Sequence, residues 1–82
     1  MSGGIPALTG RELIRLLQQD DWIIDGKRTH GVAMKKMGPD GILRITIIPT
    51  HGGTLPKGTL ASILGPKQTN IGMAGLRKLL QK

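Results

Sequence analysis

The sequence contains no cysteine, no phenylalanine and no tyrosine, and Trp22 is its single aromatic residue. Without cysteine, the chain can form no disulfide bond, no cysteine metal site and no thiol nucleophile. Its 82 residues suffice for one small core and leave no room for a second. We therefore expect a single domain over residues 1–82, in which residues 1–8 are flexible and residues 66–82 form a C-terminal extension.

Acidic residues are also scarce, with 5 Asp and Glu against 12 Lys and Arg, which gives a formal net charge of +7. A small protein this basic usually binds a polyanion, namely a nucleic acid, an acidic protein or an anionic membrane; a merely soluble surface is the alternative. A carboxylate metal site needs several acids close together, and here the few acids compete with the surrounding positive charge. We expect neither a bound metal nor any other cofactor.

Long apolar segments are missing too. The longest apolar run, "GILRITIIPT" at residues 41–50, is interrupted by Arg44 and is far too short to span a bilayer. The first ten residues have neither the charged region nor the long apolar region of a signal peptide, and no stretch carries the aromatic anchors of a membrane-surface helix. These absences predict a cytoplasmic protein without a membrane partner.

A helix is predicted from Gly10 to about Gln19. Leucines recur near helical spacing in "LTGRELIRLLQQDDW". Thr9 and Glu12 fit a capping box, in which each side chain bonds the backbone N–H of the other residue and so marks the helix start.

A β-hairpin is predicted around "MGPDGI" at residues 37–42, because its Gly-Pro-Asp-Gly core is a strong turn signal between two β-capable runs. Before the hairpin, "WIID" at residues 22–25 reads as a short strand and "GKRT" at residues 26–29 as a turn. We take the hairpin turn to be centred between Pro39 and Asp40.

This turn position predicts the cross-strand register. Met34 would lie opposite Ile45, and Lys35 opposite Arg44. One face of the hairpin would then be apolar and the other basic and open, although Lys36 falls on the apolar face.

Two helical segments follow the hairpin. "KGTLASILG" has Pro56 near its first turn and Gly65 as its stop, and residues 66–82 suggest a weaker C-terminal helix. The predicted fold is α+β, a three-stranded antiparallel sheet with helices on one face and an extra C-terminal helical segment.

Histidine is the residue type that offers chemistry here, because it exchanges protons near neutral pH. The predicted register brings His30, His51 and Arg28 to the open end of the hairpin. A histidine there could take the proton of a ribose 2′-OH while nearby cations stabilise the phosphate, which is RNA cleavage without a metal. The alternatives are that His30 is a phosphate contact or simply exposed, and that His51 is an ordinary loop residue.

Several cations could form a phosphate track on the two adjacent strands, or simply a solvated face. Trp22 is expected in the core, with base stacking as the alternative. The glycine-rich loop before Lys57 lacks the ending of a phosphate loop, but the start of the helix after it could meet a phosphate. The candidate RNA-binding residues are Lys27, Arg28, Thr29, Lys35, Lys36, Arg44, His51 and Lys57.

Three stretches resemble the HicA toxin family of HicA–HicB toxin–antitoxin systems over nearly the whole chain. "TGRELIRLLQQDDWI" is similar to the family's first helix and strand, and "RTHG" to its signature of a small hydroxyl residue followed by histidine. "LPKGTLASILGPKQTNIGMAGLRKLL" is similar to its second helix and to the C-terminus of one branch of the family.

The resemblance implies a fold like the double-stranded-RNA-binding domain and a metal-independent endonuclease that cleaves mRNA. The catalytic histidine of the family's Gly-Ser-His motif falls on His30, with Thr29 in place of serine and Arg28 in place of glycine. Ala33 stands where an aromatic residue commonly follows the histidine. The family's Pro-x-His loop corresponds to Pro49 and His51, and we assign His51 to binding.

The resemblance also implies the partners, which are mRNA and an acidic HicB-type antitoxin that masks the active site. Two alternatives remain at this point. One is a non-catalytic RNA-binding module in which His30 is one more contact. The other is a DNA-binding subunit, but no predicted helix concentrates the cations needed to enter a major groove.

Overall fold

The computed structural model describes residues 7–81. Residues 1–6, which belong to the segment expected to be flexible, and residue 82 lie outside the described residues. The elements follow one another as helix, three strands and two helices: α1 (Gly10–Gln19), β1 (Ile23–Arg28), β2 (Gly31–Met37), β3 (Leu43–Ile48), α2 (Lys57–Leu64) and α3 (Gly72–Leu80). The predicted α+β fold with a C-terminal helix is therefore confirmed.

Helix α1 begins and ends where the sequence predicts. The Thr9 side chain accepts a hydrogen bond from the Glu12 N–H, and the Glu12 side chain accepts one from the Thr9 N–H at 2.9 Å, so the capping box is complete. Leu13, Ile14 and Leu17 are buried along one face of the helix. This apolar stripe attaches α1 to the core.

The sheet is antiparallel, with strand order β1-β2-β3. Strand β1 extends to Arg28, so the expected turn at residues 26–29 is wrong. Only Thr29 and His30 separate β1 from β2. An irregularity between Ile24 and Lys27 interrupts the β1–β2 pairing. Such a bulge adds local twist and lets the strand continue past the break.

The predicted β2–β3 register is wrong by one residue. Met34 pairs with Thr46, and Lys35 pairs with Ile45. The cause is the turn, a five-residue loop closed by a hydrogen bond from the Gly38 N–H to the Ile42 carbonyl oxygen (2.9 Å).

Gly41 makes this longer loop possible, because it adopts a φ of +80°, a left-handed conformation that glycine takes without steric cost. The Asp40 carboxylate also accepts a hydrogen bond from the Ile42 N–H (3.0 Å). A shift of one residue exchanges the two faces of β3. As a result, Thr46 and Ile48 point to the helices, while Ile45 and Ile47 lie on the open side.

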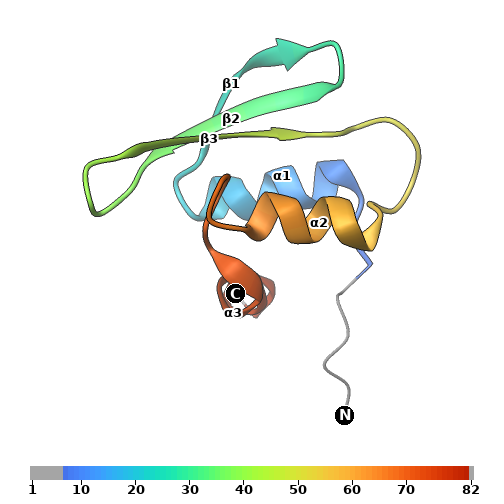
Figure 1. Ribbon diagram of the computed structural model, residues 1–82. Coiled ribbons are helices and arrows are strands. Elements are labelled where there is room, and N and C mark those ends of the chain that lie inside the picture. Colours follow the sequence, from blue (N-terminus) through green and yellow to red (C-terminus); the bar gives the residue numbers. More distant parts are fainter. Residues whose placement is uncertain (1–6, 82) are drawn as a thin grey trace.

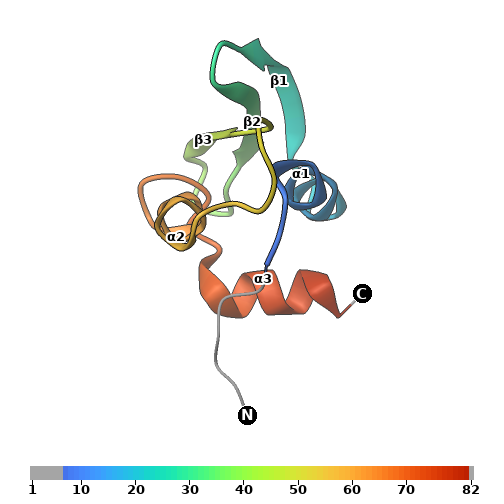
Figure 2. The same ribbon diagram turned by 90° about the vertical axis from the view of Figure 1, so that its right-hand side faces the viewer.

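The helices form two layers beneath the sheet (Figures 1 and 2). Helices α1 and α2 cover one face of the sheet, and α3 runs under both of them on the side away from the sheet. Thr46 is buried on the helix side and donates a hydrogen bond to Gln68, which joins the sheet to the segment before α3. Within the described residues, no helix covers the opposite face of the sheet.

The core lies between the sheet and the helices. Trp22 is 2% exposed, which confirms the core assignment over a stacking role. Its indole N–H has no hydrogen-bond partner within residues 7–81. In the same range, no helix has both the length and the apolar character needed to cross a bilayer. The buried apolar side chains of the core cluster are Leu8, Leu13, Ile14, Leu17, Trp22, Met34, Ile48, Leu55, Leu60, Ile63, Leu64, Leu76 and Leu79.

Candidate nucleic-acid interface

Several connections meet at one end of the molecule, the end that holds the β1–β2 turn (Figure 1). The loop after β3 returns along the start of α1, where Thr9 bridges to Thr54 and the Leu55 N–H donates to the Leu8 carbonyl oxygen at 2.7 Å. Gly10, the first residue of α1, packs so closely on the loop that a Cβ atom would overlap the Pro49 carbonyl oxygen. The start of α1 and the loop after β3 are therefore held together, at the same end of the molecule as the β1–β2 turn.

An open cavity of about 430 Å³ lies among these three segments. Basic and hydroxyl side chains surround it, and none of its lining residues is an aspartate or glutamate. A cavity lined only by cations and neutral groups attracts anions. We call it the basic cavity, and its lining residues are Arg11, Ile14, Lys27, Arg28, Thr29, Gly31, Val32, Thr50 and His51.

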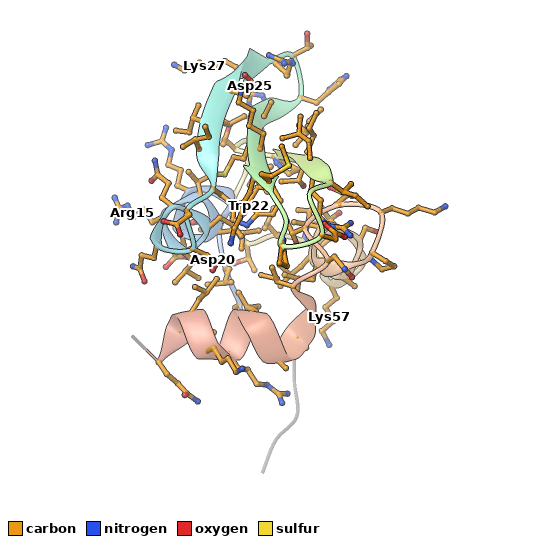
Figure 3. The ribbon with its side chains drawn as sticks, turned by 90° about the vertical axis from the view of Figure 1, so that its left-hand side faces the viewer. Arg15, Asp20, Trp22, Asp25, Lys27 and Lys57 are labelled. Carbon is orange, nitrogen blue, oxygen red and sulfur yellow. The ribbon has the colours of Figure 1, made fainter. Side chains whose placement is uncertain are left out.

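The cations of the basic cavity are available for an anionic ligand. Arg11 and Lys27 are exposed, and neither forms an ion pair within residues 7–81. Figure 3 shows Lys27 projecting outward from the end of β1 that lies away from the helices. Arg28 makes a hydrogen bond to the Asp25 carbonyl oxygen (3.3 Å), and its guanidinium stands 3.9 Å from the Asp25 carboxylate. These are long contacts that a phosphate could replace.

His30 lies in the turn between β1 and β2, at the open end of the β2–β3 hairpin. Its neighbours Thr29 and Gly31 both line the basic cavity, whereas His30 itself is exposed and is not part of the lining. His51 belongs to the lining. Both histidines thus lie at the end of the hairpin where the sequence predicts them.

The other predicted RNA contacts lie elsewhere. Lys35 is on the open side of the sheet, where its ammonium is 3.2 Å from the Asp25 carboxylate. Lys36 lies opposite Arg44 across the β2–β3 pair, on the helix side of the sheet. The predicted pairing of Lys35 with Arg44 is therefore wrong. Lys57 is exposed at the start of α2.

A second open cavity, of about 250 Å³, lies at the opposite end of the hairpin. Its charges are balanced, because Lys36 is 3.2 Å from Asp20 and Arg44 is 3.5 Å from Asp40. Arg44 also donates a hydrogen bond to the Pro66 carbonyl oxygen (3.1 Å). This cavity therefore has less attraction for a polyanion than the basic cavity.

Arg11 is the site residue that sequence reasoning missed. It follows Gly10 at the start of α1 and therefore stands beside the partial positive charge of the helix N-terminus. The capping box predicts the position of this helix end, but only the structure shows that the end lies beside the β1–β2 turn and the loop after β3. The acid nearest in sequence, Glu12, is held by the cap: hydrogen bonds from the backbone and side chain of Thr9 lower its pKa.

Residues 7–81 contain no cluster of three or more His, Asp or Glu side chains that could hold a metal ion. The basic cavity can bind phosphate groups with Arg11, Lys27 and Arg28. A phosphate bound there lies near the turn that carries the exposed imidazole of His30.

The comparisons with known proteins give one family. Residues 10–71 match the family model of the HicA toxin of bacterial toxin–antitoxin systems. This range includes the whole basic cavity and extends into the segment before α3. No curated protein and no solved structure matches the chain at a significant level. Since the match covers more than half of the sequence, the chain belongs to the HicA toxin family of toxin–antitoxin systems.

Proposed function

We propose that this toxin is an endoribonuclease that cleaves mRNA without a metal ion, with His30 as its general acid or base. The observation that carries the proposal is the basic cavity, which offers Arg11, Lys27 and Arg28 without an opposing carboxylate in its lining. An RNA backbone in this cavity passes beside the β1–β2 turn, where His30 is exposed. Thr29 precedes His30 in the chain and lines the basic cavity, and we assign it the orientation of the phosphate or of the imidazole.

The proposed reaction uses the RNA's own nucleophile. His30 removes the proton of a ribose 2′-OH, the 2′-oxygen bonds to the adjacent phosphorus, and the bond from phosphorus to the 5′-oxygen breaks. The departing 5′-oxygen takes a proton from the imidazolium that His30 has become, or from water, and the products carry a 2′,3′-cyclic phosphate and a 5′-hydroxyl. The cations of the cavity stabilise the charge that develops on the phosphoryl oxygens.

The remaining predicted contacts take different places in this proposal. His51 lines the basic cavity and binds the backbone on the side of the loop. Lys57 is an outlying contact from the start of α2. Lys35, Lys36 and Arg44 already contact aspartates, which reduces what they can contribute to RNA binding.

We also propose the setting in which the toxin works. The substrate is mRNA, the location is the cytoplasm, and the partner is a HicB-type antitoxin. A chain with a net charge of +7 is best neutralised by an acidic protein that covers His30 or keeps RNA away from it.

A cleavage assay tests the proposal. The purified chain is incubated in EDTA with a single-stranded RNA and with the same RNA carrying 2′-O-methyl groups. We expect cleavage of the first to products with cyclic phosphate ends and no cleavage of the second. Binding of both RNAs without cleavage would identify the chain as a non-catalytic RNA-binding module, and activity lost only on chelation would show a metal mechanism.

A further inference from the structure

The face of the sheet that the helices leave uncovered is apolar. Register places its large side chains together, because Ile23 and Ile45 flank Lys35, and Met37 pairs with Leu43. These side chains and that of Ile47 are between 43% and 58% exposed. Scattered exposed apolar residues are normal, but a contiguous group marks an interaction surface. We call this surface the open sheet face; its residues are Ile23, Met37, Leu43, Ile45 and Ile47.

Charge on the open sheet face is largely compensated. Lys35 lies in its middle, and its ammonium is 3.2 Å from Asp25. The same carboxylate is 3.9 Å from the guanidinium of Arg28, at the edge nearest the β1–β2 turn. The centre of the face is thus apolar with one ion pair, and positive charge increases toward the basic cavity.

RNA is a poor occupant for this surface. A polynucleotide needs free cations for its phosphates or aromatic rings for its bases. The open sheet face has no aromatic residue, since Trp22 is on the core side, and Lys35 is already paired. An apolar centre with a charged edge is instead the pattern of a protein interface.

A second copy of this chain is also a poor occupant. Each copy carries a net charge of +7, and pairing two open sheet faces would bring two such charges together. An acidic protein is a better occupant than a second copy. Its negative charge is attracted by the basic edge of the face at Arg28, and its apolar residues can cover Ile45 and Ile47. Membership in a toxin–antitoxin family supplies a partner of the right kind.

We propose that the antitoxin docks on the open sheet face, with its apolar side chains against Ile45 and Ile47 and its acidic side chains along the edge at Arg28. The inference rests on the proposed function only in taking the partner to be an acidic antitoxin. Ile47 is the residue of the face nearest the β1–β2 turn that carries His30, because it pairs with Ala33, whereas Met37 and Leu43 lie at the other end of the strands. A partner that extends from Ile47 past Arg28 would therefore reach the proposed active site. Docking and masking then use adjoining parts of one surface.

The test compares two variants of the full chain. Ile45→Thr with Ile47→Thr removes apolar contact area from the face and keeps β-branched residues suited to a strand. Leu80→Gln is the matched control, because Leu80 is 41% exposed on α3, in the layer away from the sheet (Figure 2). The probe is the protein encoded by the neighbouring reading frame. Its affinity for each chain is measured by calorimetry without RNA, and thermal melts check that each variant is folded.

We expect the double variant to bind the probe about 100-fold more weakly and the Leu80 variant to bind it like the parent chain. When co-produced with the probe, the double variant should remain toxic. Equal binding by all three chains, or a basic probe, would overturn the proposal. A parent chain that is dimeric alone and becomes monomeric on the double substitution would assign the face to a second copy, and a matching loss of RNA affinity would assign it to RNA. RNA cleavage is assayed separately, so a failure of the proposed nuclease function is distinguishable from a failure of docking.

Discussion

Lys36 lies directly opposite Arg44 across the β2–β3 pair, and each of the two cations contacts its own aspartate, Asp20 at 3.2 Å and Asp40 at 3.5 Å. Two like charges opposite each other would repel, and the aspartates offset this cost. The pair therefore serves the structure at the end of the hairpin away from the basic cavity.

The first prediction follows from the contacts of Arg44. Arg44→Ala removes an ion pair with Asp40 and a hydrogen bond to the Pro66 carbonyl oxygen. Because Arg44 is only partly exposed, we expect a loss of about 1 kcal/mol in the free energy of unfolding, seen as a drop of about 5 °C in Tm. Lys67→Ala, which removes a cation without an ion pair in residues 7–81, is the control. An Arg44 variant with unchanged Tm and sharply weaker RNA binding would instead make Arg44 an RNA contact.

The second prediction concerns the basic cavity. Arg11→Ala with Lys27→Ala should weaken RNA binding for all sequences, because both residues are proposed to contact phosphates. Each lost contact should reduce the slope of log affinity against log salt by about 0.7. Lys67→Ala with Lys78→Ala changes the net charge equally and lies outside the cavity. If both double variants reduce the slope to the same extent, the cavity has no special role.

The third prediction tests the attachment of α1 to the site loop. Gly10→Ala places a methyl group against the Pro49 carbonyl oxygen, so the helix start and the loop must separate. We expect a loss of about 2 kcal/mol or more in unfolding free energy, measured by urea denaturation. Gly58→Ala in α2, where a Cβ meets open space, should instead gain about 0.5 to 1 kcal/mol. Equal stability of the two variants would contradict the packing described for Gly10.

The fourth prediction concerns pH. Hydrogen bonds from Thr9 lower the pKa of Glu12 in the folded state, so the ionised carboxylate stabilises the fold. This stabilisation is fully present above the pKa of the unfolded chain and is lost as pH falls through the folded pKa. In urea denaturation, the stability difference between the parent chain and Glu12→Gln should be constant above the pKa of an unperturbed glutamate and should shrink as the pH falls below it. A difference independent of pH would show that the charge of Glu12 contributes nothing.

The sequence predicts the helices well because their signals are local. The capping box at Thr9 and Glu12 and the stop at Gly65 need only neighbouring residues, and both helices begin and end as predicted. The turn signal at "MGPDGI" is also local and correctly places a loop between β2 and β3, but the loop is centred on Asp40 and not between Pro39 and Asp40.

The sequence does not predict which face of β3 is buried. Four- and five-residue loops both fit the turn signal, and the left-handed conformation of Gly41 selects the longer one. Both faces of β3 are also suitable for a core: one carries Ile45 and Ile47, the other Thr46 and Ile48. The buried face is decided by tertiary contacts such as the hydrogen bond from Thr46 to Gln68, which periodicity does not reveal.

The candidate site is predicted in part. His30, His51 and Arg28 lie at the same end of the β2–β3 hairpin. Arg28 ends β1, His30 comes just before β2, and His51 comes shortly after the end of β3. Arg11 joins them through the packing of α1 on the loop, a long-range contact with no local signal. The open sheet face was expected to be basic and is apolar, as a direct consequence of the one-residue shift.

The central claim is that His30 carries the chemistry of RNA cleavage. The most direct measurement is the single-turnover cleavage rate of the parent chain and of His30→Ala on one RNA, in EDTA, with both proteins shown to melt at the same temperature. Loss of a general acid or base should lower the rate by about 100-fold or more while RNA affinity changes little, since the cations of the basic cavity remain. A His30→Ala chain that cuts the RNA at a rate comparable to the parent would contradict the claim.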